Sequence, residues 1–133
     1  EDRKKISSRV AMEQCVQTST TFASWVEKAK KDFVLMKDAL KEADFEKIGE
    51  ITESNALAMH ETTTTSSPSF TFLTEESHRA MDIVKQLRSQ GYRCYFTMDA
   101  GPNVKVLYLK EDQEKLYEEI SKLWNKKIIL CME

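Results

Sequence analysis

The sequence predicts an α+β domain of ferredoxin-like type, with a mainly antiparallel sheet and helices packed on one face. The chain has 133 residues, which is about the length of one domain. Hydrophobic residues make up 41% of the chain and charged residues 32%, so it holds enough apolar material for one packed core. Helical periodicity fills the first half, and the second half contains two short strand-like segments joined by a tight turn. We therefore expect a single domain over residues 1–133.

The first half predicts a pair of antiparallel helices. Residues 7–41 carry apolar side chains at steps of three and four, which predicts one long helix with a core-facing stripe of Phe22, Trp25, Val26, Ala29, Phe33, Met36 and Leu40. Asp44 is the expected N-cap of the next helix, whose inward face would carry Ile48, Ile51, Asn55 and Ala58. A polar loop rich in Thr and Ser should follow at residues 61–68.

The second half predicts the sheet and two further helices. Thr74 should cap a helix that ends at Gly91, the residue suited to a left-handed position after a helix. Two strands are expected at 92–98 and 103–109, joined by a tight connection. Leu116, Ile120, Leu123 and Trp124 predict a last helix, and the apolar run at 126–132 predicts a closing strand. Residues 4–6 could end another strand.

Composition excludes several classes of function. The net charge of −2, from 20 basic and 22 acidic residues, argues against non-specific binding to nucleic acid. Residues 62–74, a run without a charge, are mostly Thr and Ser, which excludes a membrane-spanning helix there. No glycine-rich phosphate loop is possible, because the glycines are only Gly49, Gly91 and Gly101. The three cysteines, Cys15, Cys94 and Cys131, are odd in number and far apart, so they indicate neither a disulfide framework nor a zinc site. Their pattern suggests a reducing, intracellular compartment.

The connection between the two predicted strands carries the main candidate for catalysis. Asp99 ends an apolar strand and is followed by Ala100, Gly101 and Pro102. Such an Asp is ordinary in a hairpin turn. A carboxylate fixed at a strand end, with small residues beside it, could also accept the proton of a ligand hydroxyl. Local sequence leaves both interpretations open.

A second candidate site lies where the first helix begins. Ser7 or Ser8 at the cap position would leave first-turn amides free to face an anion, and Arg9 could form a charge-assisted bond to phosphate or carboxylate. The alternative is a plain hydroxyl cap beside a solvated Arg9. His60 is expected to end a helix, where the helix dipole would favour its cation, in a capping or hydrogen-bonding role; a catalytic role is the alternative. A metal site is not indicated, because no second His or Cys lies at ligand spacing.

Four stretches together carry a resemblance to a known family: Ile6-Ser-Ser-Arg-x-x-Met12, Asn55-x-Leu-x-Met-His60 followed by Thr62-Thr63, Pro68-x-Phe70-Thr, and Phe96-Thr-Met-Asp-Ala-Gly-Pro-Asn-Val-Lys105. In register from residue 6 to about 109, the chain resembles the C-terminal half of the diphosphomevalonate decarboxylases, which belong to the GHMP kinases. The last stretch is similar to the family's signature around its acid. The resemblance implies the fold of a GHMP-kinase C-terminal domain.

The resemblance also implies an activity. The family uses ATP and Mg²⁺ to convert mevalonate 5-diphosphate to isopentenyl diphosphate, ADP, phosphate and CO₂, in the mevalonate pathway of isoprenoid biosynthesis and lipid metabolism. By the match, Asp99 corresponds to the catalytic acid beside the tertiary hydroxyl of the substrate. Ser8 and Arg9 correspond to substrate-binding residues near the diphosphate, and Met12 lines the same pocket. The family further implies a cytoplasmic homodimer that binds neither nucleic acid nor membrane.

The resemblance also predicts what this sequence lacks. In GHMP kinases the glycine-rich loop for the ATP phosphates belongs to an N-terminal domain, so we expect that domain to be absent from this chain and the isolated chain to be inactive. One alternative is the C-terminal domain of another GHMP small-molecule kinase, which the signature around Asp99 counts against. The other is a non-catalytic α+β ligand-binding domain, in which Asp99 is only a turn residue.

Overall fold

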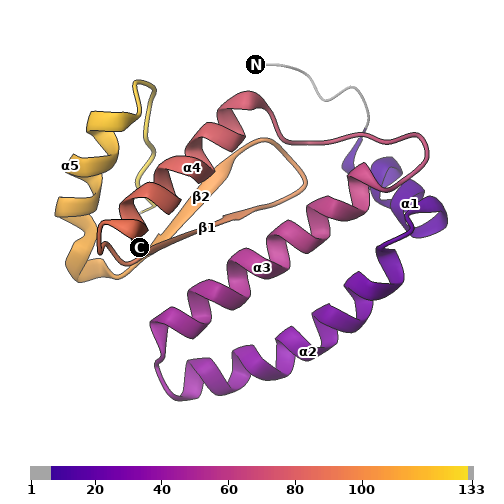
Figure 1. Ribbon diagram of the computed structural model, residues 1–133, viewed down its shortest axis with the longest axis horizontal. Helices are drawn as coiled ribbons and strands as arrows, with labels where there is room; N and C mark the ends of the chain where they lie inside the picture. Colours follow the sequence, from indigo (N-terminus) through magenta and orange to yellow (C-terminus); the bar gives the residue numbers. More distant parts are fainter. Residues whose placement is uncertain (1–6, 132–133) are drawn as a thin grey trace.

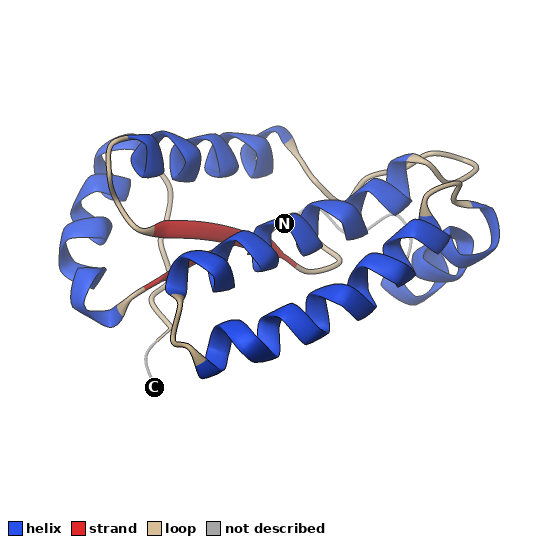
Figure 2. Cartoon of the chain, turned by 60° about the horizontal axis from the view of Figure 1, so that its bottom comes forward, coloured by secondary structure: helices blue, strands red, loops and turns tan. Residues whose placement is uncertain are grey.

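The computed structural model describes residues 7–131. Within this range the order of elements is α1 (Ser8–Thr18), α2 (Phe22–Lys41), α3 (Phe45–Thr64), α4 (Glu75–Ser89), β1 (Cys94–Met98), β2 (Val104–Tyr108), a 3₁₀ turn η1 (Lys110–Asp112) and α5 (Gln113–Leu123). The predicted strand end at 4–6 lies outside the described residues. Helices dominate, and a small sheet lies among them (Figure 2).

The two strands form an antiparallel pair, with Phe96 opposite Val106 and Thr97 opposite Lys105. This confirms the predicted α+β class and the predicted hairpin. Figure 1 shows α4 along one side of the strands and the α2–α3 pair along the other, with the β1–β2 connection directed toward the end of the molecule that holds α1. The connection that carries Asp99 is thereby brought near the first helix.

The core lies between β1, α4 and α5. Alternate residues of β1 present one apolar face, since successive side chains of a strand point to opposite sides. That face meets the buried stripe of α4 and Leu116 of α5, and the core cluster comprises Ala56, Met81, Ile83, Val84, Leu87, Cys94, Phe96, Met98 and Leu116. Burial raises the pKa of the Cys94 thiol to about 11, so this cysteine is a packed apolar residue and not a nucleophile.

Both ends of α4 follow the sequence prediction. The Ser77 amide donates to the Thr74 hydroxyl at 3.2 Å, and the Thr74 amide donates to the Ser77 hydroxyl at 3.0 Å, which completes a reciprocal cap. Gly91 follows the helix with φ of +99°, the left-handed conformation that favours glycine. The direction of the chain into β1 is set by these local signals.

The single long helix expected over 7–41 is wrong, because the chain breaks into α1 and α2 at residues 19–21. The hydroxyls of Ser19, Thr21 and Thr65 form a cluster, with oxygen–oxygen distances of 2.8 Å for Ser19–Thr65 and 2.9 Å for Thr21–Thr65. Hydroxyl side chains that bond locally compete with the helical backbone pattern. The break turns α1 away from α2 and toward the end of α3.

The predicted apolar stripe of α2 is less buried than expected. Phe33 is 66% exposed and Leu40 is 60% exposed, whereas Asp32 and Ala39 are buried. Asp32 accepts a hydrogen bond from the Asn55 side-chain amide of α3 at 3.1 Å. The α2–α3 contact is therefore built on a neighbouring face of α2 that includes a polar pair, so the apolar stripe lies partly uncovered.

The expected loop at 61–68 begins later than predicted, because α3 continues to Thr64. Thr62 and Thr63 are fully buried. Their hydroxyls donate to the carbonyls of Met59 and His60, both at 2.6 Å. Bonds of this kind let a threonine run stay helical, which the turn-rich composition of the segment did not indicate.

The closing strand expected at 126–132 is absent over its described part, residues 126–131. Ile129 is 75% exposed. Apolar β-branched residues favour a strand only where a partner edge receives them, and this segment forms no ladder with β1 or β2.

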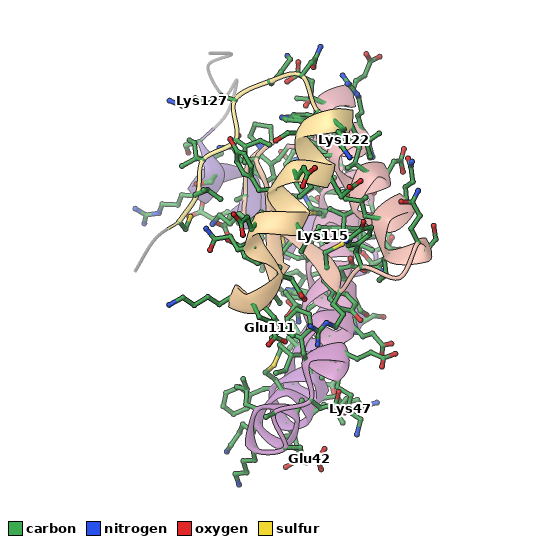
Figure 3. The ribbon with its side chains drawn as sticks, turned by 90° about the vertical axis from the view of Figure 1, so that its left-hand side faces the viewer. Glu42, Lys47, Glu111, Lys115, Lys122 and Lys127 are labelled. Carbon is green, nitrogen blue, oxygen red and sulfur yellow. The ribbon has the colours of Figure 1, made fainter. Side chains whose placement is uncertain are left out.

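Helix α3, the second helix of the α2–α3 hairpin, begins as predicted: the Asp44 carboxylate accepts a hydrogen bond from the Lys47 amide at 3.2 Å. Glu42 and Lys47 lie at the tip of the hairpin, away from the sheet (Figure 3), and their charged groups approach to 3.7 Å. Further along α3, Gly49 contacts the Tyr95 ring of β1. This close approach fixes α3 against the strand that leads to Asp99.

No helix in the described range combines the length and apolarity needed to cross a lipid bilayer.

Candidate functional site

The candidate site is an open cavity of about 390 Å³ where α1, α2, α3 and the end of β1 meet. Met12 reaches it from α1 and Trp25 from α2, while Asn55 and Met59 line it from α3. Asp99 lies at the end of β1 and completes the wall. The cavity is mainly apolar, with a carboxylate at its rim.

Asp99 projects largely into solvent, with 79% of its side chain exposed. Its carboxylate bonds to the Lys105 ammonium of β2, with Nζ–Oδ2 at 2.5 Å. That bond and the positive charge of Lys105 lower the pKa of the Asp99 carboxyl. Asp99 is therefore ionised at neutral pH and can accept a hydrogen bond or a proton.

The turn that carries Asp99 is held at both ends. The Gly101 amide donates to the Asp99 carbonyl at 2.8 Å, which closes the start of the turn. At its far end the buried Ser77 hydroxyl donates to the Pro102 carbonyl at 2.5 Å. The same hydroxyl belongs to the N-terminal cap of α4, so the turn is anchored on the core helix.

Of the site residues predicted on α1, one lines the cavity and the others lie outside it. Met12 lines the cavity together with Asp99. Ser7 is the N-cap, because its hydroxyl accepts from the Val10 amide at 3.3 Å. Ser8 opens the helix and Arg9 is 90% exposed, with its guanidinium 3.7 Å from the Glu13 carboxylate. The structure brings Met12 and Asp99 together and leaves Ser8 and Arg9 one turn away on α1.

His60 is the residue that sequence reasoning placed incorrectly. It does not end a helix, since α3 continues past it, and it is only 4% exposed. Burial lowers the pKa of its imidazole, an effect opposed by the nearby backbone of Asp99 and Met98 and by the Asp99 charge. Its ring and the Phe72 ring pack edge to face, with ring centroids 6.3 Å apart. Its position after a run of small and apolar residues, Ala56 to Met59, could have indicated burial.

Within residues 7–131, no group of three or more His, Cys, Asp or Glu side chains is placed to hold a metal ion.

Comparison with known proteins connects this chain to a family. The family model "Mevalonate 5-diphosphate decarboxylase C-terminal domain" matches residues 1–130. The chain belongs to this family. It is 54% identical to the mevalonate pyrophosphate decarboxylase of Streptococcus pyogenes, with a TM-score of 0.88 over 92% of this chain and 39% of that one.

Other members of the decarboxylase family agree with this assignment. The structure from Enterococcus faecalis is 44% identical, with a TM-score of 0.87 over 90% of this chain and 37% of that chain. Diphosphomevalonate decarboxylase of Candida albicans is 30% identical over 117 residues, which cover 87% of this chain and 32% of that protein. The chain thus spans about a third of the length of the curated decarboxylases it matches.

Proposed function

We propose that this chain supplies the C-terminal catalytic half of an ATP-dependent decarboxylase. The enzyme would convert mevalonate 5-diphosphate to isopentenyl diphosphate, ADP, phosphate and CO₂, in the mevalonate pathway. Membership of the decarboxylase family supports this proposal. The observation that carries it is the ionised Asp99 carboxylate at the rim of a cavity that Met12 also lines.

In this proposal Asp99 acts on the tertiary hydroxyl of the substrate, as a base or as the group that orients the hydroxyl for attack on a phosphoryl group. A carboxylate that is already ionised can accept the hydroxyl proton without first losing its own. Ser8 and Arg9 would lie near the substrate diphosphate, where Arg9 can exchange its exposed partner Glu13 for phosphate oxygens. Met12 and the α3 wall would exclude water from the hydrocarbon part of the substrate.

ATP and Mg²⁺ would be bound mainly by residues outside this chain. A relative of 44% identity and TM-score 0.89, MDDEF, has been solved in complex with MVAPP, AMPPCP and magnesium. The sequence has no glycine-rich loop, and the described residues hold no cluster of metal ligands. We therefore propose that residues 1–133 are one domain and that an N-terminal ATP-binding domain lies outside it. Magnesium-bound ATP supplies the phosphoryl group when it is present.

From the family resemblance we also propose a cytoplasmic enzyme that is a homodimer at full length. The chain on its own is expected to release no CO₂ from mevalonate 5-diphosphate and ATP.

The deciding experiment uses the full-length protein that carries this domain. Labelled CO₂ release from mevalonate 5-diphosphate is measured with ATP and Mg²⁺, in the wild type and in Asp99→Asn. We expect the variant to lose about 10²–10⁴-fold in turnover, the usual contribution of a general base. Its melting temperature should hardly change, because an exposed ion pair contributes little to stability.

The alternative, a structural turn residue, predicts the reverse result. Asp99→Asn and Asp99→Ala would then keep their activity and lose on the order of 1 kcal/mol of stability, as when a turn or cap bond is removed. Full turnover in both variants, with that loss of stability, would exclude the proposed role of Asp99.

A further inference from the structure

His60 combines deep burial with missing hydrogen bonds. Its side chain is 4% exposed, yet neither ring nitrogen makes a hydrogen bond of ordinary geometry; the backbone of Asp99 and Met98 lies close enough to interact with the ring but is not in full hydrogen-bond position. Buried polar atoms are paired in the great majority of cases, and an unpaired one in a folded protein calls for an explanation. Metal binding does not provide it, because no cluster of metal ligands is present in residues 7–131.

The position of His60 relative to β1 suggests what the ring faces. Arg88 donates to the Cys94 carbonyl at 3.0 Å, and the Phe96 amide donates to the Glu53 carboxylate at 3.0 Å. Residues 94 and 96 therefore turn their backbone groups to the edge of β1 that β2 leaves open. Since strand residues alternate, Met98 turns its backbone groups to the same edge.

Glu53 and His60 lie about two helical turns apart on α3, and so share one face of the helix. Glu53 uses that face to bond the edge of β1 at Phe96. His60 lies opposite the end of the same edge, where the backbone of Met98 and Asp99 is beside its ring. Side chains therefore lie along this edge of β1: Arg88 and Glu53 bond its backbone, and His60 lies at the end of the strand next to Asp99.

We propose that His60 is a positioning residue for Asp99: its neutral imidazole donates one ring N–H to the backbone carbonyl at Met98–Asp99 and so fixes the direction of the Asp99 carboxylate. This inference rests on the function proposed above. The ring does not line the cavity, so it acts through the backbone and does not touch the substrate. Its burial keeps the imidazole neutral, with one donor nitrogen available.

Two features of the site differ from those of a working catalytic centre: the direction of the Asp99 carboxylate and the missing hydrogen bond of the His60 ring. The proposal explains both. In the structure the Asp99 carboxylate bonds Lys105 and faces solvent, while the His60 ring lies beside the backbone of Asp99 and Met98 without a hydrogen bond of ordinary geometry. In this proposal the Met98–Asp99 peptide shifts toward α3 as the carboxylate turns into the cavity that both elements line. That movement brings the peptide carbonyl onto the His60 ring and holds the carboxylate at the substrate hydroxyl.

The test uses the full-length protein and three variants of α3. His60→Phe removes the donor and keeps a ring of similar size, His60→Gln restores a donor, and Glu61→Gln changes an exposed neighbour as a control. We expect turnover of His60→Phe to fall about 10–100-fold, the scale on which misplacing a catalytic group acts. The KM for mevalonate 5-diphosphate should stay within about threefold, because a positioning group acts on the transition state more than on substrate binding.

His60→Gln should recover a measurable part of the lost turnover, and Glu61→Gln should match the wild type. A role in packing alone predicts instead that His60→Phe lowers the melting temperature and leaves turnover of the folded enzyme unchanged. Wild-type turnover in His60→Phe would overturn the proposal.

A second measurement applies if His60→Phe fails to fold. The ring ¹⁵N resonances of His60 are followed in the wild-type full-length protein as mevalonate 5-diphosphate is added. We expect the ligand to bring the ring to a single neutral tautomer with one hydrogen-bonded N–H. A ring that does not respond to the ligand, or that is protonated in the complex, would overturn the proposal.

The outcomes separate this inference from the function on which it rests. If the wild-type full-length protein releases no CO₂, the proposed function fails and the role of His60 fails with it. If the wild type is active and Asp99→Asn is not, while His60→Phe keeps full turnover, only the role of His60 is refuted.

Discussion

Gly49 is a point of close approach between α3 and β1, and a methyl group there should cost more than its helix propensity gains. A Cβ at residue 49 would lie 2.1 Å from Cδ2 and 2.3 Å from Cγ of the Tyr95 ring. Ordinary carbon–carbon contact begins near about 3.5 Å, so α3 or the ring must move by about 1.4 Å. The ring is held by the Arg88 guanidinium 4.7 Å from its centroid and by the edge of Phe45 at 5.6 Å.

The expected loss for Gly49→Ala follows from two opposing effects. Overpacking of a buried contact costs about 3 kcal/mol at the upper end of its usual range. Replacing glycine by alanine within a helix stabilises it by about 1 kcal/mol. The free energy of unfolding should therefore fall by about 2 kcal/mol, seen as a lower urea midpoint with an unchanged m-value.

Two further variants separate the steric effect from helix propensity. Ser54→Ala, at an exposed position of the same helix, should raise stability by about 0.5 kcal/mol. Gly49→Ala in a Tyr95→Leu background should no longer destabilise, because the ring that it meets is gone. If Gly49→Ala alone is as stable as the wild type, α3 does not pack against β1 as closely as the structure has it.

Two other perturbations test the supports of the site. Glu53→Ala removes both the carboxylate paired with Arg88 at 2.6 Å and the acceptor of the buried Phe96 amide, so we expect a loss of about 3 kcal/mol in urea denaturation. Glu111→Ala, which breaks an exposed ion pair, should cost less than about 0.5 kcal/mol, and equal losses in the two variants would contradict this assignment. Lys105→Met should raise the pKa of Asp99 toward its ordinary value, since the ammonium that lowers it is removed, and Lys105→Arg should keep it low. The carboxyl ¹³C resonance of Asp99, followed against pH, checks the direction, and the same titration in Lys105→Met and the wild type would refute it.

Several elements were predictable from sequence because their signals are local. The caps at Asp44 and Thr74 are side-chain bonds to amides three residues away, so residue type and spacing specify them. Gly91 takes a positive φ that few other residues adopt. The register of β1 with β2 follows from the alternation of apolar residues around a short turn.

The remaining features depend on partners distant in sequence. The break at Ser19 is stabilised by Thr65, and the exposure of Phe33 depends on which face of α2 meets α3. For the candidate site, the motif located Asp99 and Met12, which line one cavity. The burial of His60 depends on how α3 crosses β1, and no spacing within the helix specifies that crossing.

The side chains along the open edge of β1 also bear on how the protein behaves in concentrated solution. Residues 94–98 are an uncharged, aromatic-rich segment of the kind that readily adds to strands of other molecules. Arg88 and Glu53 occupy the backbone groups through which an incoming strand would have to pair. An intermolecular ladder on residues 94 and 96 would require this ion pair to separate, so the contact that holds α3 and α4 beside the strand also disfavours self-assembly through this edge.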